Sequence, residues 1–352
     1  MTQRGDGMAA DIAEQPAGMA RLLEGDHAAA IAAVAAAVAR RRPRNVVFVA
    51  RGTSDHAALY GAYLSEIRLG LPVASASPSA ITLYGARPDF TGSLVVGVSQ
   101  SGGSPDLTGV LQVARETGGI TLAVTNNPGS PLAAAAELAI DVAAGHERAV
   151  AATKTYTAEL LALLLLIEGI RADGGALPGD ERAALDRLPR LAEEALGDSA
   201  ADELAQRYRF ASRMVTTGRG YAYPTAREAA LKLMETSYLP ALAFSGADLL
   251  HGPLAMTDPD VPVLAIVGDG PGGRSMREVV ARLAERRADV VTIGATEVAG
   301  AAGRLAVPAV ADERYSALLD ILPLQKLALA LALARGEDPD APRGLTKVTT
   351  TL

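Results

Sequence analysis

The segment SLVVGVSQSGGSPDLTGVLQVARETG, residues 93–118, joins an apolar run, a loop of serines and glycines, and a run with helical spacing. It predicts a strand, a loop and a helix. The strand lacks polar alternation, which is typical of a parallel sheet covered on both faces. NVVFVARGTSDHAALYGAYL, residues 45–64, has the same order. We therefore expect an α/β fold built on a doubly wound parallel sheet with helices on both faces.

The pattern occurs twice along the chain. VPVLAIVGDGPGGRSMREVV, residues 261–280, repeats the strand, glycine-rich loop and helix of the first half. Arg219 follows Arg51 by 168 residues, and Gly268 follows Ser99 by 169. A nearly constant offset predicts two tandem copies of one flavodoxin-like domain. The expected segments are a helical N-terminal part (1–40), a first domain (41–172), a linker and helix (173–209), a second domain (210–336) and a tail that acts as a lid (337–352).

Composition excludes several classes of protein. The 352 residues contain no cysteine, so disulfides, thiolate metal sites and a cysteine nucleophile are absent from this chain. The net charge is −7 without a basic block, which argues against a nucleic-acid partner. The apolar run 160–167 is far shorter than the ~20 residues of a membrane span, and the N-terminus does not look like a signal peptide. We expect a cytoplasmic protein without a membrane partner.

Two loops of the first half lie where a parallel sheet binds ligands, at the carboxyl ends of its strands. Each loop opens a helix, whose free N–H groups suit a phosphate. Ordinary helix capping by Ser and Thr is the alternative. Neither dinucleotide nor nucleoside-triphosphate motifs are present. The second-half copies of these loops, GRGYAY and GDGPGG, have lost most hydroxyls. The candidate phosphate-binding residues are Gly52, Thr53, Ser54, Ser99, Gln100, Ser101 and Ser104.

The second half carries candidates for acid–base chemistry. In AREAALKLMETSY, residues 226–238, helical spacing places Glu228, Lys232 and Glu235 on one face. His251 follows in the turn SGADLLHGP. A carboxylate, an amine and an imidazole near a sugar phosphate can move protons. A solvated salt-bridge face is the alternative, and Lys347 in the tail is by itself an ordinary exposed lysine.

Several motifs together resemble a known family. RGTSDHA, SQSGGSPD, TNNPGSPL, GHERAVAATKTYT, SGADLLHGP and PRGLTKVT occur in this order from about residue 40 to the C-terminus. The chain resembles proteins with sugar-isomerase (SIS) domains, in particular the isomerase half of glucosamine-6-phosphate synthase. It is most similar to the stand-alone SIS-type glucosamine-6-phosphate deaminases. The resemblance implies two tandem SIS domains, no metal or organic cofactor, and a homodimer with shared active sites.

The resemblance also implies a role for each candidate. Ser54, Ser99, Gln100, Ser101 and Ser104 would hold the phosphate, with Thr53 beside them and Asn127 offering backbone contacts. Glu235 would move a proton between C1 and C2, supported by Glu228, while Lys232 would position the sugar hydroxyls. His251 would open the sugar ring, in the active site of the neighbouring subunit. Lys347 would form a Schiff base with the ketose or hold its carbonyl.

Three functions remain open from the sequence. The first is deamination of glucosamine 6-phosphate to fructose 6-phosphate and ammonia, because the synthase's glutamine-hydrolysing domain and its cysteine are missing here. The second is a related aldose–ketose enzyme: an ammonia-dependent aminotransferase, a fructosamine-phosphate deglycase or a galactosamine-6-phosphate deaminase. The third is a non-catalytic sugar-phosphate sensor, which would not need Glu235, His251 and Lys347 together.

Overall fold

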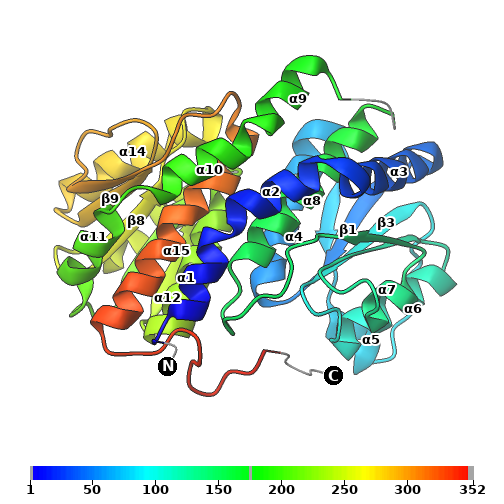
Figure 1. The fold of residues 1–352 in the computed structure, drawn as a ribbon, viewed down its shortest axis with the longest axis horizontal. Coiled ribbons are helices and arrows are strands. Elements are labelled where there is room, and N and C mark those ends of the chain that lie inside the picture. Colours follow the sequence, from blue (N-terminus) through cyan, green and yellow to red (C-terminus); the bar gives the residue numbers. More distant parts are fainter. Residues whose placement is uncertain (1–2, 174–176, 348–352) are drawn as a thin grey trace. The chain divides into compact units, whose positions relative to one another are not determined.

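The structure is a computed structural model that describes residues 3–173 and 177–347 (Figure 1). Residues 174–176 of the expected linker and 348–352 of the expected tail lie outside the described residues. The chain forms two compact units. The first-sheet unit comprises residues 17–146, 154–186 and 346–352, and the second-sheet unit comprises residues 1–16, 147–153 and 187–345.

The first sheet has five parallel strands in the order β2-β1-β3-β4-β5. The order reverses between β1 and β3, which makes this the switch point at which doubly wound sheets bind ligands. The core strand β3 is buried along its whole length, in agreement with its unbroken apolar run. The bounds are β1 (Asn45–Val49), β2 (Val73–Ser75), β3 (Ser93–Ser99), β4 (Ile120–Thr125) and β5 (Leu138–Asp141).

Helices cover both faces of the first sheet. One layer contains α4 and α8, with α3 packed on α8, and the other contains α6 with α5 and α7 (Figure 1). The bounds in this part of the chain are α2 (Gln15–Leu23), α3 (Gly25–Arg41), α4 (Gly52–Leu64), the π-helical turn η1 (Ser65–Leu69), α5 (Pro78–Thr82), α6 (Pro105–Glu116), α7 (Pro131–Ala135), α8 (Lys154–Arg171) and α9 (Gly179–Asp186).

The second sheet repeats the first. Its five parallel strands have the order β10-β9-β8-β6-β7, which is the same connection scheme and places a second switch point between β6 and β8. The predicted fold, two tandem doubly wound domains, is therefore confirmed. The bounds are β6 (Met214–Gly218), β7 (Ala241–Ser245), β8 (Pro262–Ile266), β9 (Asp289–Gly294) and β10 (Gly303–Ala306).

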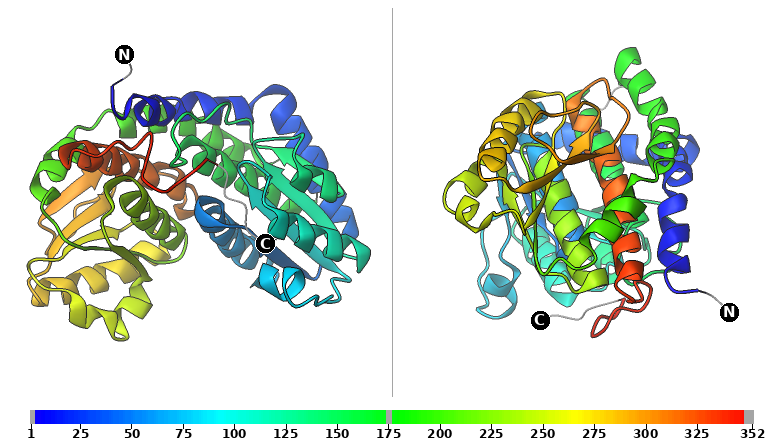
Figure 2. Two further views of the ribbon diagram at one scale, coloured as in Figure 1. Left: turned by 90° about the horizontal axis from the view of Figure 1, so that it is seen from below. Right: turned by 90° about the vertical axis from the view of Figure 1, so that its left-hand side faces the viewer.

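Two helical layers enclose the second sheet as well. Helix α12 contacts β6, β7 and β8 and is backed by α15, whereas α14 contacts β8 and β9 from the other side (Figures 1 and 2). The bounds are α1 (Asp6–Ala13), α10 (Leu188–Leu196), α11 (Ala200–Tyr208), α12 (Ala222–Ser237), α13 (Gly246–Leu250), the 3₁₀ turns η2 (Pro253–Met256) and η3 (Glu313–Tyr315), α14 (Pro271–Glu285) and α15 (Ala317–Ala334).

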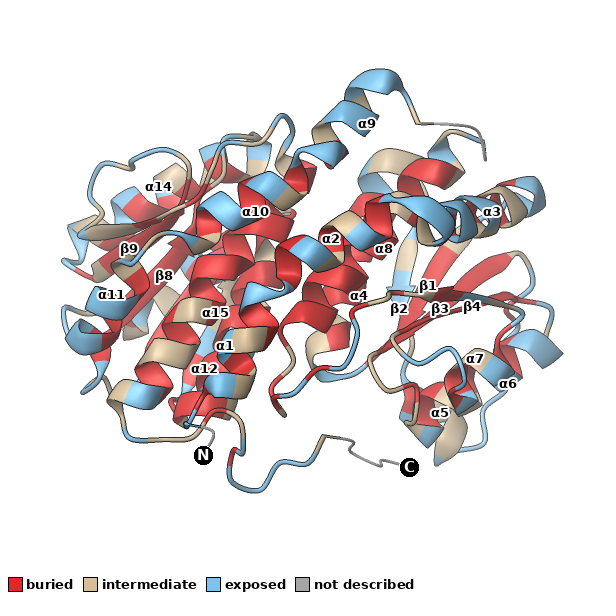
Figure 3. Ribbon diagram, in the orientation of Figure 1, coloured by how far each residue is buried: buried red, intermediate tan, exposed pale blue. Residues whose placement is uncertain are grey.

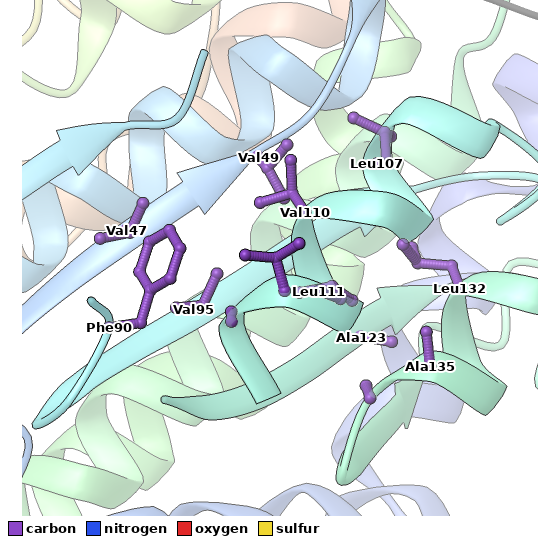
Figure 4. Close-up of a cluster of buried hydrophobic side chains, with 13 residues drawn as sticks. Val47, Val49, Phe90, Val95, Leu107, Val110, Leu111, Ala123, Leu132 and Ala135 are labelled. Atoms are coloured by element: carbon purple, nitrogen blue, oxygen red, sulfur yellow. The ribbon is translucent and has the colours of Figure 1, made fainter. Parts of the chain in front are cut away.

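Each unit has its own aliphatic core. In the first-sheet unit, Val47, Val95 and Leu111 belong to a cluster in which side chains of the sheet meet those of α6 and α7 (Figure 4). In the second-sheet unit, Val263, Met276 and Val280 belong to the matching cluster between the sheet and α14. The burial colours of Figure 3 show that the central strands and the inner helices α8, α12 and α15 are mostly buried, whereas the edge strand β2 is not. The sheets are thus held rigidly enough to position their loops.

Within the described residues, one helical segment, Glu313–Ala334, is long and apolar enough to cross a membrane by composition alone. Of its apolar window, 72% is buried inside the structure, where α15 contacts α10, α11 and α12. The bent pair α1–α2 and α3, with a 61° break, passes the same test as one combined span. For α15, burial against neighbouring helices accounts for the apolar composition.

Candidate functional site

The two hydroxyl-rich loops lie on either side of the first sheet's switch point. Residues 51–54 connect β1 to α4, and residues 99–104 connect β3 to α6. The two strands are neighbours in the sheet, so the loops emerge side by side from the same edge. Arg51 Nη2 lies 2.9 Å from the buried Asp106 Oδ2 at the start of α6, which ties the two loops together. The predicted pairing of these loops is therefore present.

Capping does not account for the hydroxyls of these loops. Ser104 is the N-cap of α6, yet in the described part of the chain its side chain makes no capping hydrogen bond. The N-cap of α4 is Arg51, whose side chain likewise makes no cap. Neither N-cap side chain thus occupies its helix N-terminus, although in α6 the N–H of Leu107 donates to Asp106 Oδ1 at 2.9 Å. Helix N-termini of this kind suit an anion.

The hydroxyl oxygens of Ser99 and Ser101 accept hydrogen bonds from amides of their own loop. The N–H of Gly102 donates to Ser99 Oγ at 3.1 Å, and the N–H of Gly103 donates to Ser101 Oγ at 3.2 Å. Because each oxygen accepts from the loop, its own proton can be donated to a ligand. Gly102 has φ of +61°, and a Cβ there would lie 2.1 Å from Ser130 Oγ, so only glycine fits this turn.

Ser54 lies differently from the other serines. Its side chain is buried and donates a hydrogen bond of 2.8 Å to Glu159 Oε1 of α8. Glu159 is itself fully buried. In this arrangement the Ser54 proton is directed at a carboxylate behind the loop, so a ligand would meet the oxygen or the backbone N–H of this residue. Thr53 is half-buried, and Gly52 is exposed with φ of +56°.

Asn127 braces the second loop. Its side-chain Nδ2 donates to the Ser101 carbonyl at 3.3 Å, and its N–H donates to Thr125 Oγ1 at 3.2 Å. Thr125 Oγ1 in turn donates to the Gln100 carbonyl at 3.3 Å. Gln100 itself is half-buried at the loop. The end of β4 thereby fixes the backbone of the serine loop.

Helix α12 of the second-sheet unit carries the predicted row of charges. Lys232 is 1% exposed and Glu228 is fully buried, so the alternative of a solvated salt-bridge face is excluded. Lys232 Nζ lies 3.4 Å from Glu228 Oε1 and donates a short hydrogen bond to Glu235 Oε2. The side chain of Glu235 is 23% exposed, which makes it the end of the row that a ligand can reach.

The charge state of Lys232 follows from its neighbours. Burial lowers the pKa of its ammonium, but Glu228, Glu235 and Glu147 raise it by more, so the net pKa lies above the usual value. The residue is therefore a cation between carboxylates. Its ammonium fixes Glu235 Oε2, and Oε1 is the oxygen left to act on a ligand.

Glu147 was missed as a candidate by the sequence reasoning. It is buried in the second-sheet unit, accepts a short hydrogen bond from the N–H of Thr153, and acts electrostatically on Lys232. The motif GHERAVAATK contains it, but spacing alone gives no sign that this glutamate faces a lysine 85 positions later. Asp11 of α1 accepts from the N–H groups of Arg148 and Ala149 and so holds the same loop.

Two candidates remain. His251 is exposed at the C-terminal end of α13. At the N-terminal end of this helix, Ser245 Oγ accepts a capping hydrogen bond from the N–H of Asp248. Lys347 is half-buried and is grouped with the first-sheet unit, which also carries the phosphate loops.

Comparison with known proteins identifies the family. The chain belongs to the SIS-domain family, whose model matches residues 41–169 and 208–335. A glutamine–fructose-6-phosphate aminotransferase (isomerizing) of Thermococcus kodakarensis is 36% identical over 355 residues. The alignment covers 97% of this chain but 58% of that relative, so the chain spans little more than half its length.

Solved structures agree with this assignment. A protein of Silicibacter pomeroyi proposed to be a phosphosugar isomerase is 35% identical with a TM-score of 0.86, and 95% of this chain aligns with 99% of that one. A glucosamine-6-phosphate deaminase of Thermotoga maritima has a TM-score of 0.78 at 20% identity, covering 98% of this chain and 100% of the other. At that identity the likeness concerns the fold alone.

Proposed function

We propose that this chain is an amino-sugar phosphate deaminase and isomerase that converts glucosamine 6-phosphate and water to fructose 6-phosphate and ammonia. The observation that carries the proposal is the row of charges on α12. A buried lysine held as a cation between carboxylates is costly to maintain, and it orients one accessible carboxylate. A protein that only sensed a sugar phosphate would not need such a group.

The phosphate would be held by the two loops of the first-sheet unit. The hydroxyls of Ser99, Ser101 and Ser104 would donate to it, and the N-cap residues of α4 and α6 make no side-chain cap. These groups bind a dianion without a metal ion. Ser54 would contribute its backbone, since its hydroxyl already donates to Glu159.

The proposed chemistry needs one carboxylate that works in both directions. His251 would assist opening of the sugar ring. Glu235 would remove the proton from C2 of the open-chain aldehyde and return it to C1, while one proton passes from the C2 amine to O1, so that C1 becomes a carbinol and the C2–N bond becomes an imine. Lys347 would take C2 as a Schiff base with release of ammonia, and water would then free the ketose.

A second candidate is the same chemistry in the opposite direction, amination of fructose 6-phosphate by ammonia. The relative that is 36% identical and named an aminotransferase favours it. Both directions use the same residues, so the equilibrium and the supply of ammonia decide between them. The expected homodimer, with His251 supplied by the neighbouring subunit, stays a prediction.

The first test is release of ammonia from glucosamine 6-phosphate by the purified protein. Glu235→Gln should lower the rate by about 10²–10⁴-fold while leaving sugar-phosphate binding intact. Glu278→Gln is the matched control, because Glu278 is an exposed carboxylate on α14 of the same unit. Equal rates for the two variants would show that Glu235 does not transfer the proton.

A companion measurement separates an enzyme from a sensor. In deuterium oxide, fructose 6-phosphate should acquire deuterium at C1 when the wild-type protein is present, because the carboxylate exchanges its proton with solvent. Tight binding of sugar phosphates without deuterium exchange or ammonia release would favour the sensor. Ammonia release from galactosamine 6-phosphate alone would instead change the assigned sugar.

A further inference from the structure

The second copy of the serine loop keeps its supporting geometry but not its hydroxyls. Arg219 repeats Arg51: its Nη1 donates to Ser275 Oγ at 2.8 Å, and Ser275 follows Asp106 by the same offset of 169 residues. The loop from β8 to α14 therefore occupies the position at the second switch point that the serine loop occupies at the first.

A carboxylate of the chain lies on this loop. Pro271 begins α14 and has no N–H, so Gly272 and Gly273 present the first free amides of the helix. The N–H of Gly272 donates to Glu313 Oε2 at 3.1 Å, and the N–H of Gly273 donates to Glu313 Oε1 at 2.8 Å. Glu313 thus binds the helix N-terminus with both oxygens, in the way that an external anion does.

The glycines of the loop fit around this carboxylate. A Cβ on Gly270 would lie 2.3 Å from Glu313 Oε2, and its three nearest neighbours would all be atoms of Glu313. A Cβ on Gly272 would lie 2.6 Å from the Arg219 carbonyl oxygen and 2.8 Å from Glu313 Oε1. Gly270 has φ of −85°, which any residue can adopt, so contact with Glu313 and not backbone strain makes glycine necessary there.

A second polar group lies near the loop. Ser316 is 7% exposed, and its Oγ makes no hydrogen bond of standard geometry among the described residues, although it interacts with the side chain of Asp320 and lowers the pKa of that carboxyl. This Oγ lies 3.9 Å from the point that a Cβ on Gly268 would occupy, and Glu313 Oε1 lies 3.5 Å from that point. A buried hydroxyl without a well-formed hydrogen bond can turn to donate to a ligand oxygen.

We propose that the loop of the second sheet is an anion-binding site whose ligand is the chain's own Glu313 carboxylate. An external oxyanion such as phosphate enters this site only when Glu313 leaves it. The first domain therefore offers an open site for a sugar phosphate, the second offers a filled one, and each chain takes up one sugar phosphate through its loops.

The test uses amide hydrogen exchange at Gly272 and Gly273 in the full-length chain, and does not depend on catalytic activity. In Glu313→Ala, exchange of these amides should accelerate by about tenfold or more, because a hydrogen bond to a charged group is lost. Sodium phosphate should restore the protection, whereas sodium chloride at equal ionic strength should not. In the wild-type protein phosphate should leave these amides unchanged.

Glu297→Ala is the matched control, since Glu297 is exposed in the same unit. Absence of phosphate protection in folded Glu313→Ala would overturn the proposal, as would equal protection in the wild type. If Glu313→Ala does not fold, Glu313→Gln keeps the size and removes the charge. Faster exchange in Glu313→Gln supports the proposal, and wild-type exchange rates would contradict it.

A double-mutant cycle provides an independent measurement of the same contact. Gly270→Ala should destabilise the wild-type protein because its methyl group collides with Glu313. In the Glu313→Ala background the same substitution should cost much less, which gives a coupling between the two sites. Equal costs in both backgrounds would show that Glu313 does not fill the loop.

Discussion

Lys232 illustrates how burial changes the role of a single charged residue. Its sequence neighbours suggest an ordinary salt-bridge ladder, yet it is 1% exposed and its raised pKa keeps it charged. A buried ion pair contributes little net stability, but removal of one member leaves the other as an isolated buried charge. The ammonium of Lys232 is therefore best understood as the group that permits Glu228 to be buried and Glu235 to be oriented.

Lys232→Met should consequently destabilise the protein strongly. The fully buried Glu228 would lose its counter-ion, and we expect a loss of about 3–5 kcal/mol in the free energy of unfolding, measured with urea. Adding Glu228→Leu should recover most of the loss. Arg190→Met serves as control, because Arg190 and Glu194 form an exposed pair at 3.9 Å whose loss should cost at most about 1 kcal/mol. If Lys232→Met lowers the free energy of unfolding by no more than Arg190→Met does, Lys232 is not the counter-ion that allows Glu228 to be buried.

The buried carboxyl of Asp320 leads to a prediction about how the stability of the protein depends on pH. Burial raises its pKa to about 8, and the charges of Glu313 and Asp269 act in the same direction. The folded protein then holds a proton that the unfolded chain, with a pKa of 3.8, has lost. Between these pH values stability should fall as pH rises, by up to about 1.4 kcal/mol per pH unit.

Asp320→Asn should remove this slope, because the amide cannot ionise. Melting temperatures of the wild type and the variant, measured from pH 5 to pH 8, should diverge in favour of the variant as pH rises. Asp260→Asn, at an exposed position of the same unit, controls for a general charge effect. A difference between wild type and Asp320→Asn that is independent of pH would refute the prediction.

At the scale of the elements, close helix packing depends on single glycines. Helix α8 packs on α3, and a Cβ on Gly169 of α8 would lie 2.7 Å from the Cβ of Ala35 on α3. Alanine is the better helix former by about 0.5–1 kcal/mol, but overpacking costs about 1–3 kcal/mol. The clash should therefore outweigh the gain in helix propensity.

Gly169→Ala is thus expected to destabilise the protein by about 1–2 kcal/mol, and the double variant with Ala35→Gly should relieve the clash. Gly18→Ala provides the contrast, since nothing lies within 4 Å of a Cβ at this position in α2. That substitution should stabilise the protein by about 0.5–1 kcal/mol. Thermal unfolding of the three variants distinguishes packing from propensity, and a stabilised Gly169→Ala would show that the helices can move apart.

Elements with a strong local pattern were predicted well, and their ends less so. The strands β1, β3 and β8 and the buried helix α8 follow from unbroken apolar runs. The N-terminal segment 1–40 was expected to be helical without any internal break, and its described part forms three helices that are interrupted near Glu14 and Glu24. Helix α15 contains Pro323 in its interior, whereas local rules place proline near a helix start. Contacts of α15 with α1, α10, α11 and α12 compensate for the lost hydrogen bond.

At the scale of the whole molecule, the duplication was visible in the sequence because the offset between the copies is nearly constant. Which residues belong to each of the two units could not be seen in the sequence. Residues 1–16 and 147–153 belong to the second-sheet unit although they precede its first strand. Their anchors are long-range contacts, such as those of Gln15 Nε2 with Gln325 Oε1 and of Gln325 Nε2 with the Thr153 carbonyl. Local periodicity contains no information about such pairs.

The same limit applies to the candidate site. The loops and the row on α12 were predictable, because glycine-rich turns and helical spacing are local signals. The hydrogen bond from Ser54 to Glu159 and the burial of Glu147 beside Lys232 were not, since each depends on partners far along the chain. Glu313 was likewise missed, although the loss of hydroxyls in GDGPGG indicated that this loop differs from its counterpart in the first half.

The discontinuous second-sheet unit has a consequence for the protein's synthesis. Helix α1 is translated some 300 residues before α15, the helix against which it packs. At about 5–20 residues per second, α1 waits for α15 for roughly 15–60 s, during which Met8 and Ile12 lack this partner helix. Nascent chains should therefore present the apolar side of α1 to chaperones until α15 has been translated.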